Sequence, residues 1–316
     1  SLIYTLYGGL RASIFTDNIQ FAVFGLLLLV SFSYLISFNS NEFNFEFINF
    51  NKPHLLSSNY MPNFTAGLTF FIAVAATNLF HQGNWQRVFS AKNNLILKSS
   101  LIYSSILIFF IVFWMGYSGL ISYSINSKVI PDLAFFDLVL NNKNSLIVIG
   151  ILILAMSLTL STIDTLINAI SSLIIVNGDQ INKSLSGKEI KNKANLIILL
   201  LSILVFVLAS EGYSILYLFL LADLLCCAAV ITIFYGFFNK KINSKLAASS
   251  IVCALIFGLL FFPSMDFQSS ILVGYLIPKD LFNSLITGNL LFVSFSISII
   301  VPLIMIFIYS LRNSFK

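Results

Sequence analysis

Apolar residues form eight long stretches along this chain, and polar residues collect between them. A helix needs about 20 predominantly apolar residues to cross the hydrocarbon core of a bilayer. The stretches predict transmembrane spans at 11–38, 64–80, 97–125, 145–176, 194–210, 213–238, 246–263 and 289–311. The pattern therefore predicts an all-α protein, a polytopic transmembrane helix bundle of about eight spans.

The fourth span carries one hydrophilic stripe. At about 100° per residue, its polar positions fall within roughly 40° either side of one line along the helix. These positions are Ser157, Ser161, Asp164, Asn168 and Ser171. An ionised carboxylate at the centre of a span costs about 2.5 to 3.5 kcal/mol on insertion scales, so it normally faces the bundle interior or a water-filled cavity. We expect the stripe to face inward, and the apolar remainder of the helix to suit lipid or packing.

The stripe offers oxygen ligands and contains no His or Cys. Oxygen ligands favour alkali or alkaline-earth cations, or protons, over transition metals. Serine and threonine are also common where transmembrane helices pack closely, so hydroxyl groups alone would indicate a packing face. Asp164 in the same stripe favours a cation site.

The composition excludes a soluble domain. Only 9% of the residues are charged and the mean hydropathy is +0.96, whereas soluble domains contain about 25% charged residues. The three cysteines lie inside apolar runs, which gives neither a disulfide framework nor a zinc-site spacing. The net charge of +5 is explained by basic loops, so we expect no nucleic-acid partner.

The distribution of basic residues predicts the orientation. If the first span runs outward from the cytoplasm, 13 of the 17 Lys and Arg residues lie on the cytoplasmic side. The outer side then holds Lys52, Lys128, Lys143 and Lys279. The positive-inside rule therefore predicts a cytoplasmic C-terminus in the plasma membrane.

Further polar residues lie in or beside the other spans. Asp17, in the first span, could reach headgroup water, while Asp223 lies about midway along the sixth span and could bond to a neighbouring helix. The short second span has Pro62 and Gly67 at its outer end, which indicates either the broken helix of a transporter or a short helix in a packed bundle.

The segment after the second span fits a membrane–water boundary. Trp85 is expected at headgroup level, and the guanidinium of Arg87 in water or on lipid phosphate. His81 reads as a proton relay or as an interfacial residue bonded to water.

Three segments resemble the sodium/solute symporter family. Gly8–Ala12 leading into Thr16–Gln20 resembles the opening of the fifth core helix of that family, and Gln82–Asn93 resembles its cytoplasmic signature after the sixth. Ser161–Thr165 resembles its eighth core helix. The segments occur in the order of the family and at roughly its spacing. One departure is His81, where many members have Asp.

The resemblance implies a LeuT-like inverted-repeat core that lacks its first four core helices. Residues 1–316 then form one transporter domain. Within it, 11–38 is the last helix of repeat one, 64–238 is repeat two, and 246–311 are extra C-terminal helices. We expect the chain to be an N-terminally truncated fragment, whose missing N-terminal helices would complete its sites.

The resemblance also implies functional residues. The main sodium site would take the hydroxyls of Ser161 and Thr162 and the carbonyl of Leu158. A second cation site would use Asp17, Ser161, Asp164 and Thr165. Thr77 and Asn78 would touch the solute.

These features predict a secondary active transporter, a sodium-coupled symporter of a small organic solute that works by alternating access. Sodium is the expected coupling ion, with a proton as the alternative, and membrane lipid surrounds the bundle. Relatives carry urea, amino acids, sugars or carboxylates, so the resemblance leaves the solute open. A sensory or regulatory membrane domain is the alternative function. The sequence contains no nucleophile–base pair with usable spacing, so we do not expect an enzyme.

Overall fold

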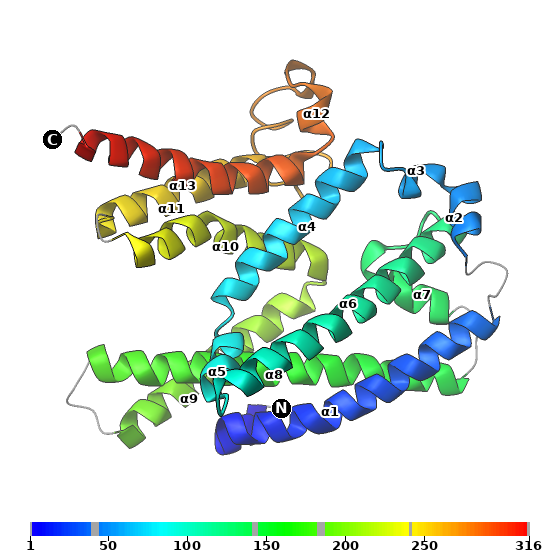
Figure 1. Ribbon diagram of the computed structural model, residues 1–316, viewed down its shortest axis with the longest axis horizontal. Helices are drawn as coiled ribbons and strands as arrows, with labels where there is room; N and C mark the ends of the chain where they lie inside the picture. Colours follow the sequence, from blue (N-terminus) through cyan, green and yellow to red (C-terminus); the bar gives the residue numbers. More distant parts are fainter. Residues whose placement is uncertain (1, 39–43, 141–144, 182–186, 240–241, 315–316) are drawn as a thin grey trace. The chain divides into compact units, whose positions relative to one another are not determined.

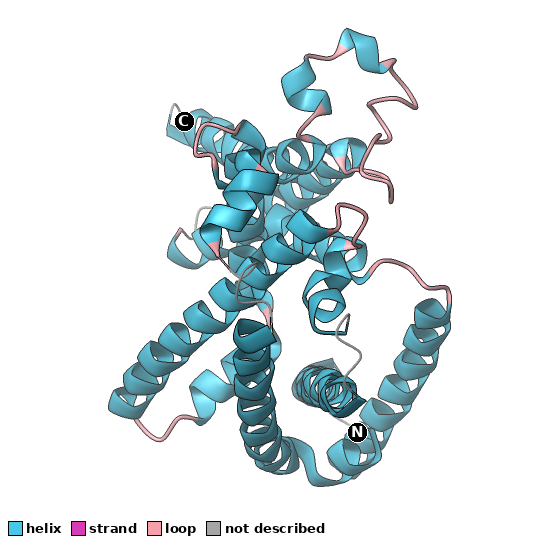
Figure 2. Cartoon of the chain, turned by 90° about the vertical axis from the view of Figure 1, so that its right-hand side faces the viewer, coloured by secondary structure: helices cyan, strands magenta, loops and turns pink. Residues whose placement is uncertain are grey.

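The computed structural model describes residues 2–38, 44–140, 145–181, 187–239 and 242–314. The long helices are α1 (Leu2–Phe38), α4 (Met61–Phe80), α6 (Asn94–Ile125), α8 (Ser145–Ile181), α9 (Gly187–Ser210), α10 (Ile215–Phe238), α11 (Ser244–Phe261) and α13 (Leu290–Ser314). The short helices are α2 (Phe45–Asn51), α3 (Pro53–Leu56), α5 (Gln82–Ser90), α7 (Ala134–Leu140) and α12 (Ser284–Thr287), with single 3₁₀ turns at Pro131–Leu133 and Lys279–Leu281. Figure 2 shows helices and loops, and the described residues form only isolated β-bridges, near Pro263–Ile277.

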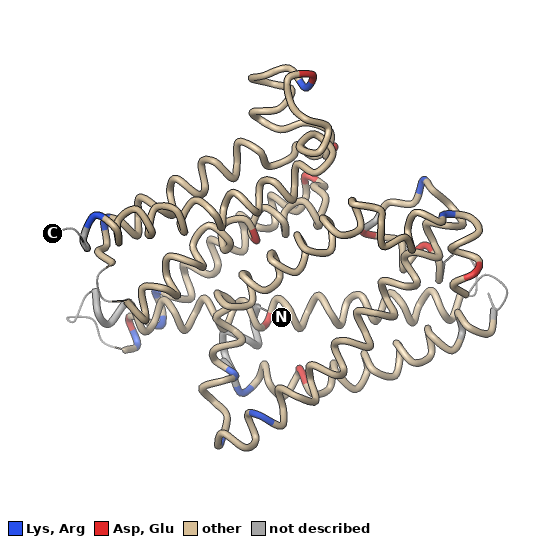
Figure 3. The backbone as a smooth tube through the Cα atoms, turned by 45° about the horizontal axis from the view of Figure 1, so that its top comes forward, with Lys and Arg blue, Asp and Glu red and all other residues tan. Residues whose placement is uncertain are grey.

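The prediction of an all-α bundle with about eight spans is confirmed. In the described ranges, the eight long helices are each long and apolar enough to cross a membrane. Lys, Arg, Asp and Glu lie mostly near helix ends and in connecting segments (Figure 3). The fifth span begins at Gly187 rather than at 194, because the Lys- and Glu-rich residues before its apolar run are also helical.

The chain divides into two compact units. Unit 1 comprises 1–56 and 82–212, and unit 2 comprises 57–81 and 213–316. In unit 1, α8 packs along α1 (Figure 1) and also against α9, α5 and α7. Short helices that the hydropathy pattern does not predict close one end of this unit, where α7 packs on α6 and α8 and α2 packs on α6. Its apolar core includes Leu35, Ile48, Ile121, Leu138 and Val139.

In unit 2, α10 packs against α4, α11 and α13. Small residues bring α11 and α13 close together. The Ser294 hydroxyl donates to the carbonyl of Gly258 at 2.7 Å, and a Cβ on Gly258 would lie 2.1 Å from the Ser298 Oγ. Glycine at this contact permits the close approach that transmembrane packing uses.

The second span is not interrupted at Pro62 or Gly67. Helix α4 is continuous from Met61 to Phe80, and Pro62 lies in its first turn, where a missing N–H costs nothing. The helix ends at His81, whose backbone is extended (φ −71°, ψ 101°), and α5 begins at the next residue. The break therefore follows directly after the segment that contains Thr77 and Asn78.

Candidate cation and solute sites

The polar stripe of α8 is the buried face of that helix. Asp164 is completely buried, and Ser157, Thr165 and Asn168 are each less than a tenth exposed. The apolar residues on the remaining surface, such as Leu160 and Ile163, are exposed by more than a third. The inward orientation expected from helical periodicity is therefore present, and it presents oxygen atoms to the helices that cover α8.

Asp17 of α1 faces this stripe. The Ser161 hydroxyl donates to the Asp17 Oδ1 at 2.8 Å, and the Asp17 side chain is 19% exposed. Thr16, beside it, instead bonds to the backbone carbonyls of Ala12 and Ser13 in its own helix. The carboxylate therefore turns toward α8.

Arg87 of α5 joins the same cluster. One of its nitrogens, Nη2, lies 2.6 Å from the Asp17 Oδ2 and donates to the Thr165 Oγ1 at 2.9 Å. The side chain of Arg87 is 43% exposed, so contact with water remains, but its guanidinium is also paired with a carboxylate inside unit 1, which was not expected. We call Asp17, Arg87, Ser161 and Thr165 the Asp17 cluster; it ties α1, α5 and α8 to one carboxylate.

Gln86 strengthens the contact between α5 and α8. Its side-chain nitrogen donates to the carbonyl of Asn168 at 3.3 Å and to the hydroxyl of Ser172. Asn168 in turn donates to the carbonyl of Asp164 at 3.1 Å. Nearby on α1, the Gln20 Oε1 is buried without a hydrogen-bond partner in the described ranges.

The residues predicted for the main sodium site lie on one turn of α8. The Thr162 hydroxyl donates to the carbonyl of Leu158 at 3.0 Å, and both residues are exposed. Ser161, by contrast, uses its hydroxyl proton to reach Asp17. Two of the three predicted oxygens are therefore adjacent, and the third is shared with the Asp17 cluster. The set consists of hydroxyl and carbonyl oxygens, which fits a hard cation such as Na⁺.

The structure separates the two predicted solute residues. Thr77 is half-buried, and its hydroxyl donates to the Asp223 Oδ1 of α10 at 2.5 Å. Asn78 is exposed and donates to the carbonyl of Val74 at 2.8 Å, within its own helix. Asp223, which the sequence places in an apolar run where it could bond to a neighbouring helix, is therefore the polar partner of Thr77.

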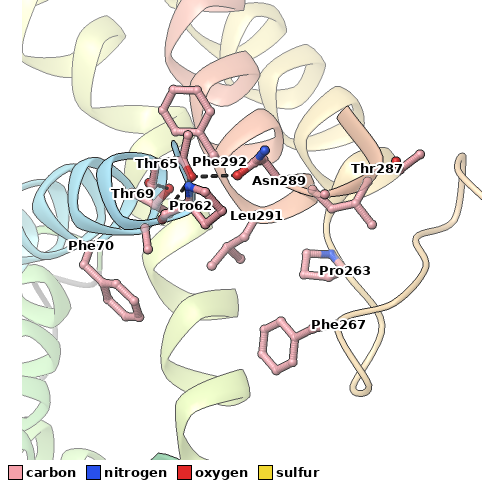
Figure 4. Close-up of a pocket in the computed structure, with 13 residues that line it drawn as sticks. Pro62, Thr65, Thr69, Phe70, Pro263, Phe267, Thr287, Asn289, Leu291 and Phe292 are labelled. Carbon is pink, nitrogen blue, oxygen red and sulfur yellow. Dashed lines mark hydrogen bonds between the residues drawn. The ribbon is translucent and has the colours of Figure 1, made fainter. Parts of the chain in front are cut away.

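A separate cavity of about 230 Å³ lies at the start of α4 (Figure 4). Thr65 and Asn289 both line this cavity, and the Thr65 hydroxyl donates to the Asn289 Oδ1 at 2.6 Å. Phe70, Phe267 and Phe292 line the rest of it. The bond between Thr65 and Asn289 links α4 to the start of α13, so the cavity lies where these two helices of unit 2 are connected.

Comparison with known proteins assigns the family. The sequence pattern of the sodium:solute symporter family matches residues 1–254, most of the chain. The chain belongs to the sodium:solute symporter family. The resemblance identified from three short segments is thereby confirmed, and the matched residues include α1, α4, α5, α8 and α10, which carry all of the predicted site residues. With its eight apolar helices, this member of the family is an integral membrane protein.

A spermidine transporter of Candida albicans is 25% identical to this chain over 238 residues. The aligned region covers 74% of this chain and 44% of the relative, so the chain spans less than half the length of the protein that it matches. No solved structure matches the chain.

The partner of Asp17 was missed by sequence reasoning. The signal that could have found it is charge balance, because an ionisable residue within a span normally pairs with another. Arg87 follows the neighbouring span and lies in the family segment that includes Gln86. Hydropathy placed Arg87 at a membrane boundary, but only the fold shows which carboxylate it reaches.

Proposed function

We propose that this protein is a sodium-coupled symporter that carries a small organic solute across the plasma membrane by alternating access. The observation that carries the proposal is the set of oxygens on one turn of α8, where the Thr162 hydroxyl and the Leu158 carbonyl lie 3.0 Å apart beside Ser161 of the inward-facing stripe. Membership of the sodium:solute symporter family supports it.

In the proposed main site, Thr162, Ser161 and Leu158 supply oxygen ligands to the sodium ion. The ion would replace the bond between Thr162 and Leu158 and would accept a lone pair from each oxygen. One charge that moves through a potential of 100 mV releases about 2.3 kcal/mol, which can drive solute uptake. Coupling requires that the ion and the solute stabilise the same conformation.

The Asp17 cluster is proposed as a second cation site, which Arg87 fills in this conformation. The Arg87 nitrogen bonds to both Asp17 and Thr165, so it lies among the oxygens that a cation would use. A sodium ion there would have to displace the guanidinium, because two positive charges next to one carboxylate repel each other. A proton on Asp17 would also weaken the pair, so proton coupling is the alternative at this site. Asp164, directly before Thr165, supplies a further buried carboxylate in the stripe.

For the solute, we propose that Thr77 and Asn78 of α4 contribute to recognition. The relative from Candida albicans is a spermidine transporter, which makes polyamines the first solutes to test. Spermidine is a flexible cation whose amines donate hydrogen bonds, and the two side chains offer oxygen acceptors.

The test is uptake by the natural protein, expressed from its complete reading frame and reconstituted into liposomes. An inward sodium gradient should drive accumulation of radiolabelled spermidine above equilibrium, and an equal potassium gradient should not. Ionophores that collapse the sodium gradient should abolish accumulation. Equal accumulation with sodium and potassium gradients would overturn sodium coupling.

A further inference from the structure

Asp223 is a carboxylate in the middle of a membrane span. It lies in α10 between Ile215 and Phe238 and is 7% exposed. Its neighbours along the helix, Leu220, Leu224 and Cys227, are almost completely buried in the apolar core of unit 2. A carboxylate in such surroundings is costly and usually marks a functional site, so its partners are informative.

One carboxylate oxygen of Asp223 has a partner. The Oδ1 accepts the Thr77 hydroxyl proton at 2.5 Å. Within the described ranges, no basic side chain pairs with Asp223, whereas Arg87 pairs with Asp17 in unit 1.

The contrast with Asp17 is the central observation. Both carboxylates lie in spans and both accept a hydroxyl proton, from Ser161 and from Thr77. The protein supplies Asp17 with a guanidinium. In the described part of unit 2, no guanidinium or ammonium group pairs with Asp223. The basic residues there all lie at or beyond the ends of the long helices; they are His81, Lys245, Lys279 and Arg312.

We propose that Asp223 and Thr77 form the binding site for the ammonium group of a cationic alkylamine solute. This inference rests on the proposed transport function and names the solute class. An alkylammonium group has three N–H donors and no acceptor. The Asp223–Thr77 pair offers three oxygens, because Thr77 donates its proton to the Oδ1 and keeps lone pairs that can accept. The bound amine supplies the positive charge that the carboxylate lacks.

The surroundings fit an amine better than a metal ion. Hard metal cations take about six or more oxygen ligands, whereas the buried residues that flank Thr77 and Asp223 along their helices include Ala73, Ala76, Leu220 and Leu224. Backbone carbonyls inside a helix are already engaged with N–H groups. Within the described ranges, no group of three or more His, Cys, Asp or Glu residues could hold a metal ion. Apolar side chains also suit the methylene chain of an alkylamine.

The test is equilibrium binding of radiolabelled spermidine and butylamine to the natural protein, expressed from its complete reading frame. Asp223→Asn keeps the size of the side chain and its bond to Thr77 but removes the charge. It should raise the Kd for both amines at least tenfold. Asp223→Glu, which keeps the charge, should retain part of the affinity. Asp266→Asn is the matched control, because it removes an exposed loop carboxylate of the same unit, and it should bind normally.

The outcomes separate this inference from the proposed function. If Asp223→Asn binds both amines normally, or if the unchanged protein binds neither amine, the amine site is wrong; sodium-driven uptake of another solute would still support the symporter. If Asp223→Asn alters only the response to sodium or to pH, Asp223 is a coupling residue and the amine site is again wrong. If Asp223→Asn does not assemble, Asp223→Glu decides the question: an unchanged Kd for two amines of different length would contradict a site that depends on the position of the carboxylate.

Discussion

Two neighbouring groups of oxygens lie on the same stretch of α8. One is the exposed pair of Thr162 and Leu158, and the other is the Asp17 cluster, which takes Ser161 and Thr165 from the inward-facing side of the helix. Adjacent residues on a helix point about 100° apart, so Ser161 and Thr162 cannot share one packing face. This divergence would allow one helix to contribute to both of the proposed cation sites, and it makes Thr162 the residue whose role is easiest to test separately.

Replacement of Thr162 should expose that role. If its hydroxyl binds sodium, Thr162→Ala should raise the sodium concentration for half-maximal uptake more than tenfold, which is about 1.4 kcal/mol. Thr162→Ser keeps the oxygen and should leave the sodium concentration for half-maximal uptake almost unchanged. The measurement is sodium-dependent uptake by the natural protein at matched expression.

Thr159→Ala is the matched control for Thr162→Ala. The Thr159 hydroxyl also bonds only to its own helix, at the carbonyl of Ala155 at 2.8 Å, and it is also exposed. The control should leave sodium activation unchanged. If Thr162→Ala and Thr159→Ala behave alike, both hydroxyls are packing groups and the main sodium site is wrongly placed.

At this scale, periodicity predicted which residues of α8 are buried but not what they bond to. Asp164 and Asn168 lie on the inner face because they follow the helical repeat of the stripe. The bond between Arg87 and Thr165 joins residues 78 positions apart. No local pattern encodes such a contact, because it depends on how α5 packs on α8. For the same reason, no local pattern identifies Thr77 as the partner of Asp223.

At the scale of the element, α5 is a nine-residue helix fixed at two neighbouring positions. Gln86 bonds to the backbone and to a side chain of α8, and Arg87 bonds to α1 and α8. An ion pair with a partly exposed guanidinium contributes little stability by itself. If the Asp17 cluster is a second cation site, as proposed, the importance of this pair is positional, because it places a positive charge where that cation would bind.

Removal of that charge should therefore change ion binding more than folding. Arg87→Gln frees the Asp17 carboxylate, so we expect the sodium concentration for half-maximal uptake to fall about fivefold, on the order of 1 kcal/mol. Arg87→Gln combined with Asp17→Asn should lose this gain. Lys98→Gln, which removes an exposed charge from the start of α6, should have no such effect. Equal responses of Arg87→Gln and Lys98→Gln would show that Arg87 does not compete with a cation.

Long elements were predicted better than short ones. The eight long helices follow from apolar runs whose lengths match the bilayer, and they were found with end shifts of a few residues. The short helices α2, α3 and α7 have too few residues to be stable alone, so they depend on packing against their neighbours. The end of the second span at residue 80 was predicted, but the interruption expected near Pro62 and Gly67 is absent, and the helix α5 that begins directly after His81 was not predicted.

At the scale of the whole molecule, the placement of basic residues predicts which ends of the helices face the cytoplasm. Asn126 follows the end of α6 and Lys188 lies at the start of α9, and both are exposed. With 13 of 17 basic residues on one side, the positive-inside rule assigns Asn126 to the outside and Lys188 to the cytoplasm.

Cysteine labelling can check this orientation in intact cells. In a variant that lacks the three native cysteines, an impermeant maleimide should modify Asn126→Cys and not Lys188→Cys. Permeabilised cells should allow both reactions, which controls for the reactivity of each position. If only Lys188→Cys is labelled from outside, the topology is the reverse of the predicted one, and the C-terminus lies outside.

The break at His81 has a mechanical consequence. Thr77, the partner of Asp223, lies four residues before it, and Arg87, the partner of Asp17, lies six residues after it. Helix α4, which carries Thr77, ends at Phe80, and α5, which carries Arg87, begins at Gln82. The two helices are therefore connected through the single residue His81. A change in the backbone angles of His81 would alter the angle between α4 and α5 while every turn of both helices stays intact. A hinge of this kind needs no unfolding of either helix.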